Sequence, residues 1–338
     1  MNERVLVLGS TGAMGSYLVP YLLEMGYRVT AVSLDDEKPL SDRMECLKGN
    51  AHDPSFLVPL VEQNFDGIVN FMSYGKYPFR DVMPLFLDHT DHYIFLSSCR
   101  VYANEEIPVR ESSPRLLDVS TDKALLASND YCIHKAKAEN LLAFSERDNW
   151  TIVRPATILS RRCFKLVTLE EPNTIGRARR GKRTVLPIQA KEKPATLSWA
   201  GDVSLEIAKL LFNEKAKREA FSVCSAEHRT WGEITDWYHE FCGLEPVWVD
   251  KEDYLRIIQP EIETKPGARW QLEYARMFDR ITDNSKVLSV TGLKQENMKP
   301  MRQALKEMFD ALPLDAVIQE DGIGQRMDEY LAARGENV

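Results

Sequence analysis

The stretch "VLVLGSTGAMGSYL" (residues 5–18) decides the fold, because it places Gly9, Gly12 and Gly15 between an apolar run and a helical pattern. Glycines at this spacing permit a tight turn, close approach of a pyrophosphate to the backbone, and close packing of helix on strand. A purely structural turn is the alternative, but the strand–loop–helix context favours dinucleotide binding. The expected contacts come from Gly9, Thr11, Gly12, Ala13, Met14 and Gly15.

The rest of the first half alternates apolar strands with helical patterns. Strands are expected at 4–9, 28–34, 65–73, 92–102 and 150–155, and helices at 13–26, 53–64, 81–90 and around Tyr131. Such alternation predicts an α/β fold with a Rossmann-like, doubly wound parallel sheet that helices cover on both faces.

The pattern loosens after Pro155, which suggests a second part of the chain. We expect a dinucleotide-binding domain over 1–160, to which 195–225 returns, and a smaller substrate-binding subdomain over 161–194 and 226–338. In that subdomain the segment 230–243 predicts a helix, with a capping box at Thr230 and Glu233 and a stop at Gly243.

Bulk composition narrows the function classes. The net charge of -8 argues against a general affinity for nucleic acid or anionic membranes. No apolar run approaches the roughly 20 residues that span a bilayer, and the first residues lack a signal-peptide layout. The six cysteines are scattered without metal-ligand spacing, which predicts reduced thiols, a cytoplasmic location and no bound metal.

The end of the second strand bears on the choice of nicotinamide cofactor. An acid there favours NAD by accepting from the ribose 2′-hydroxyl, whereas an arginine nearby favours NADP. The chain offers Ser33 and then Asp35 and Asp36, with no base immediately beyond. NAD is therefore expected over NADP, although both aspartates also suit a solvated turn.

Tyr131 and Lys135 lie four positions apart in "NDYCIHKAKAEN" (129–140) and share one helix face. This spacing alone arises by chance in many helices. Together with the glycine loop, "SSCRVY" (97–102) and "WTIVRP" (150–155), however, it resembles the extended short-chain dehydrogenase/reductase family, in the group of NAD-dependent epimerases and dehydratases. The resemblance covers most of the chain and is more specific in its first two thirds.

The resemblance implies a catalytic trio of Ser98, Tyr131 and Lys135. A phenol has a pKa of about 10 and is a poor base at neutral pH. A lysine ammonium and a bound nicotinamide cation both favour the phenolate, so the tyrosine can take a hydroxyl proton while hydride leaves. The serine would donate a hydrogen bond to the same oxygen, and the lysine would also hold the nicotinamide ribose.

The resemblance adds further cofactor contacts and two departures. The additional contacts are Asn50, Ala51, Met72 and Pro155. Asn50 stands where the family commonly has an aspartate, so the adenine contact differs. Family dehydratases place an acid pair just after the catalytic serine or threonine, where this chain has Cys99 and Arg100, so dehydratase activity is disfavoured.

The sequence looks closest to a branch that includes bacterial NAD-dependent epimerases and the chloroplast stem-loop RNA-binding proteins. The leading hypothesis is an NAD-dependent epimerase, dehydrogenase or reductase that acts on a sugar or sugar nucleotide, and the resemblance implies a homodimer. The alternative is a non-catalytic protein that keeps the nucleotide-binding fold and binds RNA or a protein. The intact trio and the acidic net charge favour the enzyme and make nucleic acid the less expected partner.

Basic residues supply the candidate substrate contacts. The segment 161–183 is rich in arginine and lysine, and it suits a sugar-nucleotide diphosphate, a solvated face or RNA phosphates. Single histidines such as His134 and His228 are more often packing or surface residues than catalysts. The candidate substrate-binding residues are Arg100, Arg177, Arg276 and Arg280, for which surface ion pairing is the alternative.

Overall fold

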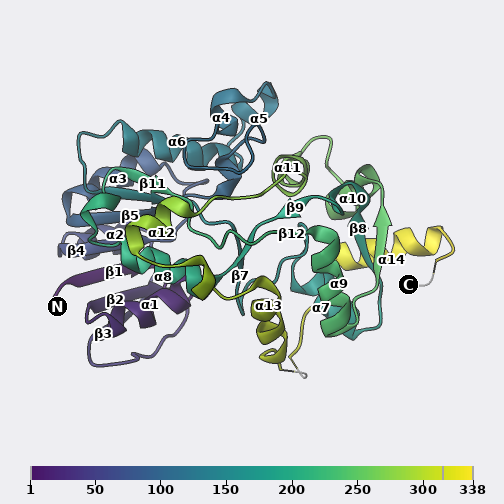
Figure 1. The fold of residues 1–338 in the computed structure, drawn as a ribbon, viewed down its shortest axis with the longest axis horizontal. Coiled ribbons are helices and arrows are strands. Elements are labelled where there is room, and N and C mark those ends of the chain that lie inside the picture. Colours follow the sequence, from purple (N-terminus) through teal and green to yellow (C-terminus); the bar gives the residue numbers. More distant parts are fainter. Residues whose placement is uncertain (1, 314–315, 337–338) are drawn as a thin grey trace. The chain divides into compact units, whose positions relative to one another are not determined.

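A seven-stranded parallel sheet forms the centre of the first half of the chain, which β11 joins from further along the sequence (Figure 1). The structure is a computed structural model that describes residues 2–313 and 316–336. The strand order β11-β6-β5-β4-β1-β2-β3 confirms the predicted doubly wound, Rossmann-like sheet. The strands are β1 (Arg4–Leu8), β2 (Arg28–Ser33), β3 (Met44–Lys48), β4 (Phe65–Asn70), β5 (Thr90–Leu96), β6 (Trp150–Val153) and β11 (Glu219–Phe221).

The burial of a strand explains whether it could be predicted from the sequence. Residues Val5 to Leu8 of β1 are fully buried, as a central parallel strand with helices on both faces requires. Strand β3 was missed by sequence reasoning because "MECLK" alternates apolar and charged residues at a partly exposed edge. An edge strand needs no continuous apolar run, and only its pairing with β2 identifies it.

Helices cover both faces of the sheet (Figure 1). One face carries α1 (Gly15–Glu24), α8 (Ala200–Leu210) and α12 (Ser285–Thr291), where α8 contacts both of the others. The other face carries α2 (Pro54–Val61), α3 (Phe79–Asp88) and α6 (Tyr131–Ala143), whose apolar sides form a core with the sheet. Short helices α4 (Leu116–Val119) and α5 (Lys123–Ala127) precede α6 in the chain.

The chain divides into two compact units, each assembled from three segments. The first unit comprises Met1–Ala156, Ser198–Ala226 and Thr282–Met298, and the second comprises Thr157–Leu197, Glu227–Ile281 and Lys299–Val338.

The segment Thr282–Met298 corrects the sequence-based division, which had left it in the substrate-binding subdomain. Thr282 forms a backbone bridge with Val109. Further along, Asn284 Nδ2 donates to the carbonyl of Cys224 at 2.8 Å, and Lys286 Nζ lies 2.6 Å from Glu219. These contacts hold the segment against the first unit, and they join residues too far apart in sequence to be foreseen.

The second unit has a separate hydrophobic core built around Trp231, Tyr238 and Tyr254. Two small ribbons lie in this unit, one parallel between β8 and β13 and one antiparallel between β9 and β12. Helix α9 confirms its predicted ends: the Thr230–Glu233 capping box is present, and Gly243 closes the helix with φ 71°. The elements are β7 (Thr157–Leu159), α7 (Ile175–Arg179), β8 (Thr184–Pro187), β9 (Pro194–Ala195), β12 (Arg229–Thr230), α9 (Trp231–Cys242), β13 (Pro246–Val249), α10 (Lys251–Ile258), α11 (Gly267–Gln271), the π-helical turn η5 (Leu272–Arg276), α13 (Met301–Asp310) and α14 (Gly322–Ala333), while β10 (Leu197–Trp199) leads back to the first unit.

Candidate functional site

The glycine loop joins β1 to α1 at the carboxyl edge of the sheet, where ligands of such folds bind. Gly9 has φ 91°, a conformation that favours glycine, and its N–H donates to Val32 O at 2.9 Å. A Cβ on Gly15 would lie 2.2 Å from Gly9 O, so only glycine fits at the first residue of α1. The tight loop leaves the helix N-terminus at the sheet edge, which fits a pyrophosphate. Thr11, Ala13 and Met14 complete this loop, and Met14 O accepts a hydrogen bond from Ser204.

Charged residues surround the end of β2. Ser33 Oγ accepts from the backbone N–H of Asp35 at 3.1 Å, which fixes the turn. Asp36 pairs with Lys48 at 2.7 Å, because β3 lies beside β2 in parallel register. Glu37 and then Lys38 follow Asp36 in the sequence, and the base that pairs with Asp36 comes from the neighbouring strand. Glu37 also reaches the glycine loop, where its carboxylate accepts from Ser10 Oγ at 2.7 Å.

The loops after β3 and β4 carry the remaining predicted adenosine-side residues. Asn50 Oδ1 accepts from the N–H of His52 at 3.0 Å, and Ala51 is buried. Met72 N donates to Asn70 Oδ1 at 2.9 Å. Tyr74 is buried in the core between the sheet and its helices rather than at the sheet edge, because its hydroxyl accepts from Asn70 Nδ2 at 2.8 Å.

Ser98, Tyr131 and Lys135 come together beyond the end of β5. Ser98 follows that strand, and its hydroxyl lies near enough to the Tyr131 phenol to lower the pKa of that phenol. Tyr131 is the first residue of α6, which Asp130 caps by accepting from Cys132 N at 3.1 Å. One turn further along, Lys135 Nζ lies 5.7 Å from the centre of the Tyr131 ring. The three groups that proton transfer would need thus converge in one place.

Burial controls the charge state of Lys135. Its side chain is 1% exposed, and Nζ donates to Leu96 O at 2.5 Å and to Met72 O at 3.4 Å. Desolvation lowers its pKa to about 7, although Glu139 one turn away opposes the shift. Lys135 therefore titrates near neutral pH, unlike an ordinary lysine.

Opposing influences act on the pKa of the Tyr131 phenol. Burial raises its pKa above the usual value, while the Arg100 guanidinium and the nearby Ser98 hydroxyl pull the pKa down. Arg100 lies in the 3-10 turn η1 (Cys99–Val101) and pairs with Asp130 at 3.1 Å. Its Cζ is 5.4 Å from the centre of the Tyr131 ring. Sequence reasoning had considered Arg100 as a substrate contact and as a residue at the position of the dehydratase acid pair, but not as a neighbour of the Tyr131 ring.

A buried ion cluster fixes α6 against the strand ends. Glu139 accepts from Arg154 at 2.8 Å and from Arg115 at 3.0 Å, and it also accepts a short hydrogen bond from Ser97. Because Ser97 precedes Ser98, the cluster connects the helix that carries Tyr131 to the segment after β5 that carries Ser98. Pro155 lies at the same edge, where its carbonyl accepts from the N–H of Cys99 at 2.9 Å.

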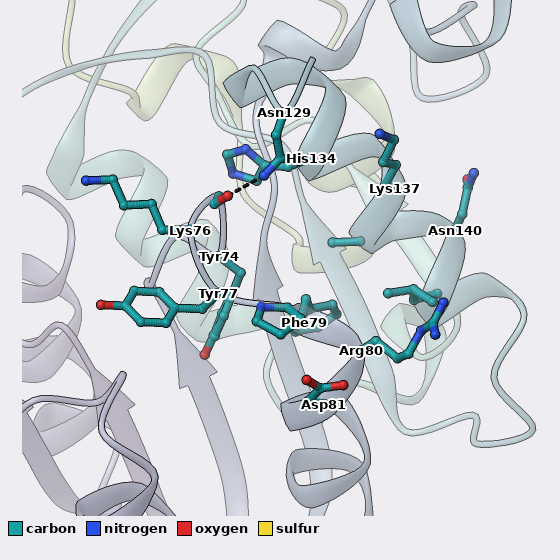
Figure 2. A pocket seen from close by; sticks show the side chains of 14 residues that line it. Tyr74, Lys76, Tyr77, Phe79, Arg80, Asp81, Asn129, His134, Lys137 and Asn140 are labelled. Carbon is teal, nitrogen blue, oxygen red and sulfur yellow. Dashed lines mark hydrogen bonds between the residues drawn. The ribbon is translucent and has the colours of Figure 1, made fainter. Parts of the chain in front are cut away.

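A pocket of about 700 Å³ opens between α6 and the loop after β4 (Figure 2). Phe79 and Leu141 provide apolar lining, and Arg80 and Lys137 bring positive charge to it. His134 also lines the pocket, and its ring packs edge-on against Tyr131 at 5.4 Å. None of Ser98, Tyr131 and Lys135 lines this pocket, so it is distinct from their cluster.

The candidate arginines of the second unit are largely engaged by the protein itself. Arg177 is fully buried and binds Arg183 O, Gly324 O and the Asp328 carboxylate at 2.6–2.8 Å. This corrects its assignment as a substrate contact, because its donors hold α14 in place. Arg276 donates to Thr157 Oγ1 at 2.8 Å, and Arg280 is 7% exposed and donates to Tyr274 O at 3.3 Å.

The basic segment is largely neutralised within the second unit. Lys182 pairs with Asp328 at 2.5 Å, Arg183 pairs with Glu336 at 2.9 Å, and Lys165 pairs with Glu170. Arg179 donates to the backbone carbonyl of Ala316 at 3.2 Å. Much of the charge run therefore anchors the end of the chain rather than presenting a free basic surface.

Two absences hold within the described residues. No cluster of three or more histidine, cysteine, aspartate or glutamate side chains there is arranged to hold a metal ion. Over 2–313 and 316–336, no helix has the length and apolar character needed to cross a membrane.

Comparison with known proteins supports the class that the fold and the glycine loop define. Residues 5–84 match the sequence model of the NAD dependent epimerase/dehydratase family, the group that the sequence resembles. No curated protein matches the sequence.

Solved structures extend the likeness in fold to the whole chain. An epimerase from Methanothermobacter thermautotrophicus has a TM-score of 0.68 at 14% identity, covering 100% of this chain and 96% of that one. UDP-glucuronic acid 4-epimerase from Bacillus cereus, in complex with UDP-glucuronic acid and NAD, has a TM-score of 0.66 at 14% identity and covers 91% and 98%. UDP-glucose 4-epimerase from Thermotoga maritima, with UDP-glucose, has a TM-score of 0.65 at 16% identity and covers 91% and 97%. These identities establish the shared fold.

Proposed function

We propose that the protein is an NAD-dependent epimerase, dehydrogenase or reductase of the extended short-chain type, acting on a sugar or sugar nucleotide. The observation that carries the proposal is the convergence of three residues beyond the end of β5: Lys135 Nζ lies 5.7 Å from the centre of the Tyr131 ring, and Ser98 lies near enough to lower the pKa of the Tyr131 phenol. The glycine loop lies at the same edge of the sheet and fits a dinucleotide. The solved neighbours that bind NAD and sugar nucleotides support this substrate class.

Tyr131 is the proposed proton acceptor and donor. A bound nicotinamide supplies hydride acceptance and return. Tyr131 takes the proton of the reacting hydroxyl, and Ser98 holds the same oxygen by hydrogen bonding. Because burial raises the pKa of Tyr131, the phenolate depends on nearby positive charge.

Lys135 is placed to exchange protons near neutral pH. With a pKa of about 7, its amine is partly neutral at physiological pH. It is also held by backbone carbonyls at the ends of β4 and β5, which sets its position relative to Tyr131. Its proposed role is to orient the nicotinamide ribose and, when protonated, to favour the phenolate of Tyr131.

Two finer choices follow from the site. Dehydratase chemistry is disfavoured, because Cys99 and Arg100 stand where an acid pair is needed and Arg100 is already paired with Asp130. NAD is proposed over NADP, because Asp35, Asp36 and Glu37 cluster after β2 and repel a 2′-phosphate. Lys48 offsets part of that repulsion, so direct titration with both nucleotides decides between them.

The alternative role in RNA binding gains little from the structure. It relied in part on the basic segment 161–183, and much of that charge is bound to carboxylates and carbonyls of the same unit. A phosphate backbone needs exposed cations that can replace its counterions. We therefore favour the enzyme.

The first test identifies the cofactor and needs no substrate. Mass and absorbance analysis of nucleotide released on denaturation is followed by titration with NAD and NADP. We expect NAD to bind more tightly than NADP. Binding of neither would overturn the proposal.

The second test addresses the proposed chemistry. Tyr131→Phe should retain NAD affinity and lose about 10²–10⁴-fold in turnover of UDP-glucose, UDP-glucuronic acid or a related sugar nucleotide. Tyr77→Phe is the matched control, because Tyr77 is 44% exposed and its ring stacks on His52 rather than on a residue of the trio. Full activity of Tyr131→Phe would exclude the proposed proton transfer.

A further inference from the structure

Two cationic side chains lie near the Tyr131 ring, and they differ in how readily each loses its proton. Arg100 Cζ is 5.4 Å from the ring centre, and Lys135 Nζ is 5.7 Å from it. Lys135 is buried, is bound by two carbonyl oxygens and has a pKa of about 7. A guanidinium, by contrast, does not lose its proton in proteins. Above neutral pH, Arg100 is therefore the permanent cation of the pair.

The position of Arg100 is set by the fold rather than by chance contact. It lies two residues beyond Ser98 in η1, and its backbone N–H donates to Ser98 Oγ at 3.2 Å. Its guanidinium pairs with Asp130, the residue that caps α6 immediately before Tyr131. The side chains of Arg100 and Asp130 are only 13% and 11% exposed, so solvent screens the pair weakly.

We propose that Arg100, held in place by Asp130, supplies the permanent positive charge that favours the phenolate of Tyr131. Arg100 thus takes over part of the role that the resemblance gives to Lys135. This inference rests on the proposed function in one respect, namely that Tyr131 is the group that transfers the proton. Arg100 acts through Tyr131 and is a positioning residue in that reaction.

The other charged and titratable groups around Tyr131 leave this assignment in place. His134 packs against the ring, but burial lowers its pKa, so at pH 7.5 it is largely neutral. Asp130 opposes Arg100, yet its carboxylate also accepts from the N–H and the thiol of Cys132. The groups facing Tyr131 come from two places in the chain. One set lies in η1 and the residue before it and comprises Ser98, Cys99 and Arg100. The other lies in α6 and its cap and comprises Asp130, His134 and Lys135. Among the influences on the Tyr131 pKa, Arg100 is the largest that lowers it.

The test measures the Tyr131 titration directly. With 3-fluorotyrosine placed at position 131, the ¹⁹F signal reports its ionisation without cofactor or substrate, and the fluorine makes the phenol acidic enough to titrate while the protein stays folded. Arg100→Gln should raise the titration midpoint by about one pH unit or more, because an opposite charge this close shifts a pKa by about 1–3 units. Arg100→Lys keeps a charge and should restore at least about half of that shift.

A control removes the arginine of a more exposed arginine–aspartate pair in the same unit. Arg147 pairs with Asp88 at 2.5 Å, and both side chains are largely exposed. Arg147→Gln changes the net charge as Arg100→Gln does and should leave the Tyr131 midpoint unchanged. An unchanged midpoint in Arg100→Gln, or an equal rise in Arg100→Lys, would overturn the proposal.

A kinetic measurement separates this inference from the proposed function. If the enzyme turns over a sugar nucleotide, kcat should rise with pH as Tyr131 ionises. Arg100→Gln should move the midpoint of that rise to a higher pH, by the same amount as the ¹⁹F midpoint. KM should change less than kcat, because the effect acts through Tyr131. If no substrate is turned over, the ¹⁹F experiment still decides the role of Arg100, while the proposed function alone fails.

Discussion

Lys135 combines deep burial with a basic group, and its energetic effect depends on pH. Its Nζ lies among backbone carbonyls, and burial lowers its pKa to about 7. An uncharged side chain would avoid this desolvation cost, so the lysine is retained at the expense of stability. This arrangement is typical of a group kept for chemistry rather than for packing.

Lys135→Met tests that cost. Since the folded pKa is lowered from 10.5 to about 7, the unfolded chain binds the extra proton between these values, and wild-type stability rises with pH across that window. The methionine variant lacks this rise. It should be more stable than wild type at pH 6 by about 1 kcal/mol or more, with the advantage shrinking toward pH 10. Urea unfolding at several pH values measures this, and lower stability at pH 6 would mean that the carbonyl hydrogen bonds outweigh desolvation.

The β1–loop–α1 element depends on a residue that has no side chain. Gly15→Ala would place a methyl group 2.2 Å from Gly9 O and 2.6 Å from Ser10 O, both of them backbone atoms. The loop must shift, which should cost about 1–3 kcal/mol and weaken nucleotide binding at least about tenfold. Thermal unfolding and NAD titration measure the two effects.

Gly267→Ala is the matched control for that element. Gly267 begins α11, and an added Cβ there meets nothing within 4 Å. The substitution should be neutral or stabilising by up to about 1 kcal/mol. Equal losses in both variants would mean that the tight packing of Gly15 is not what matters.

Among helices, strands and loops, the sequence predicts those that depend on neighbouring residues in the chain. The glycine loop, the buried strands and both ends of α9 were all foreseen from neighbouring residues. Strand β3, the Lys48–Asp36 pair and the burial of Arg177 were not, because each depends on a partner from another element. The positions of Ser98, Tyr131 and Lys135 were selected by resemblance. Their convergence needs the fold, and their roles remain a prediction.

The whole molecule depends on chain segments that leave one unit and return to it. Asn284, in the last segment of the first unit, donates to Cys224 O at 2.8 Å and to Gln295 Oε1 at 2.7 Å. Its side chain is 5% exposed, so these bonds are made out of water. The hydrogen bond to Cys224 holds the last segment of the first unit beside the residues that follow β11.

Asn284→Ala tests the importance of this return. Removing the amide leaves two acceptors without that donor and should cost about 1–3 kcal/mol. The control Asn297→Ala lies in the same segment at an exposed position and should change stability by less than about 0.5 kcal/mol. Urea unfolding of both variants measures the difference, and equal stabilities would show that the segment is held by its other contacts.

The three-segment first unit also has a consequence for biosynthesis. A ribosome releases the chain from its N-terminus, so β1 to β6 emerge well before the edge strand β11, and α12 emerges later still. Until Thr282–Met298 leaves the exit tunnel, the α8 surface and the β11 edge lack their final cover. The nascent chain therefore carries an open apolar surface through the synthesis of most of the second unit, a stage at which chaperones that shield such surfaces have most to contribute.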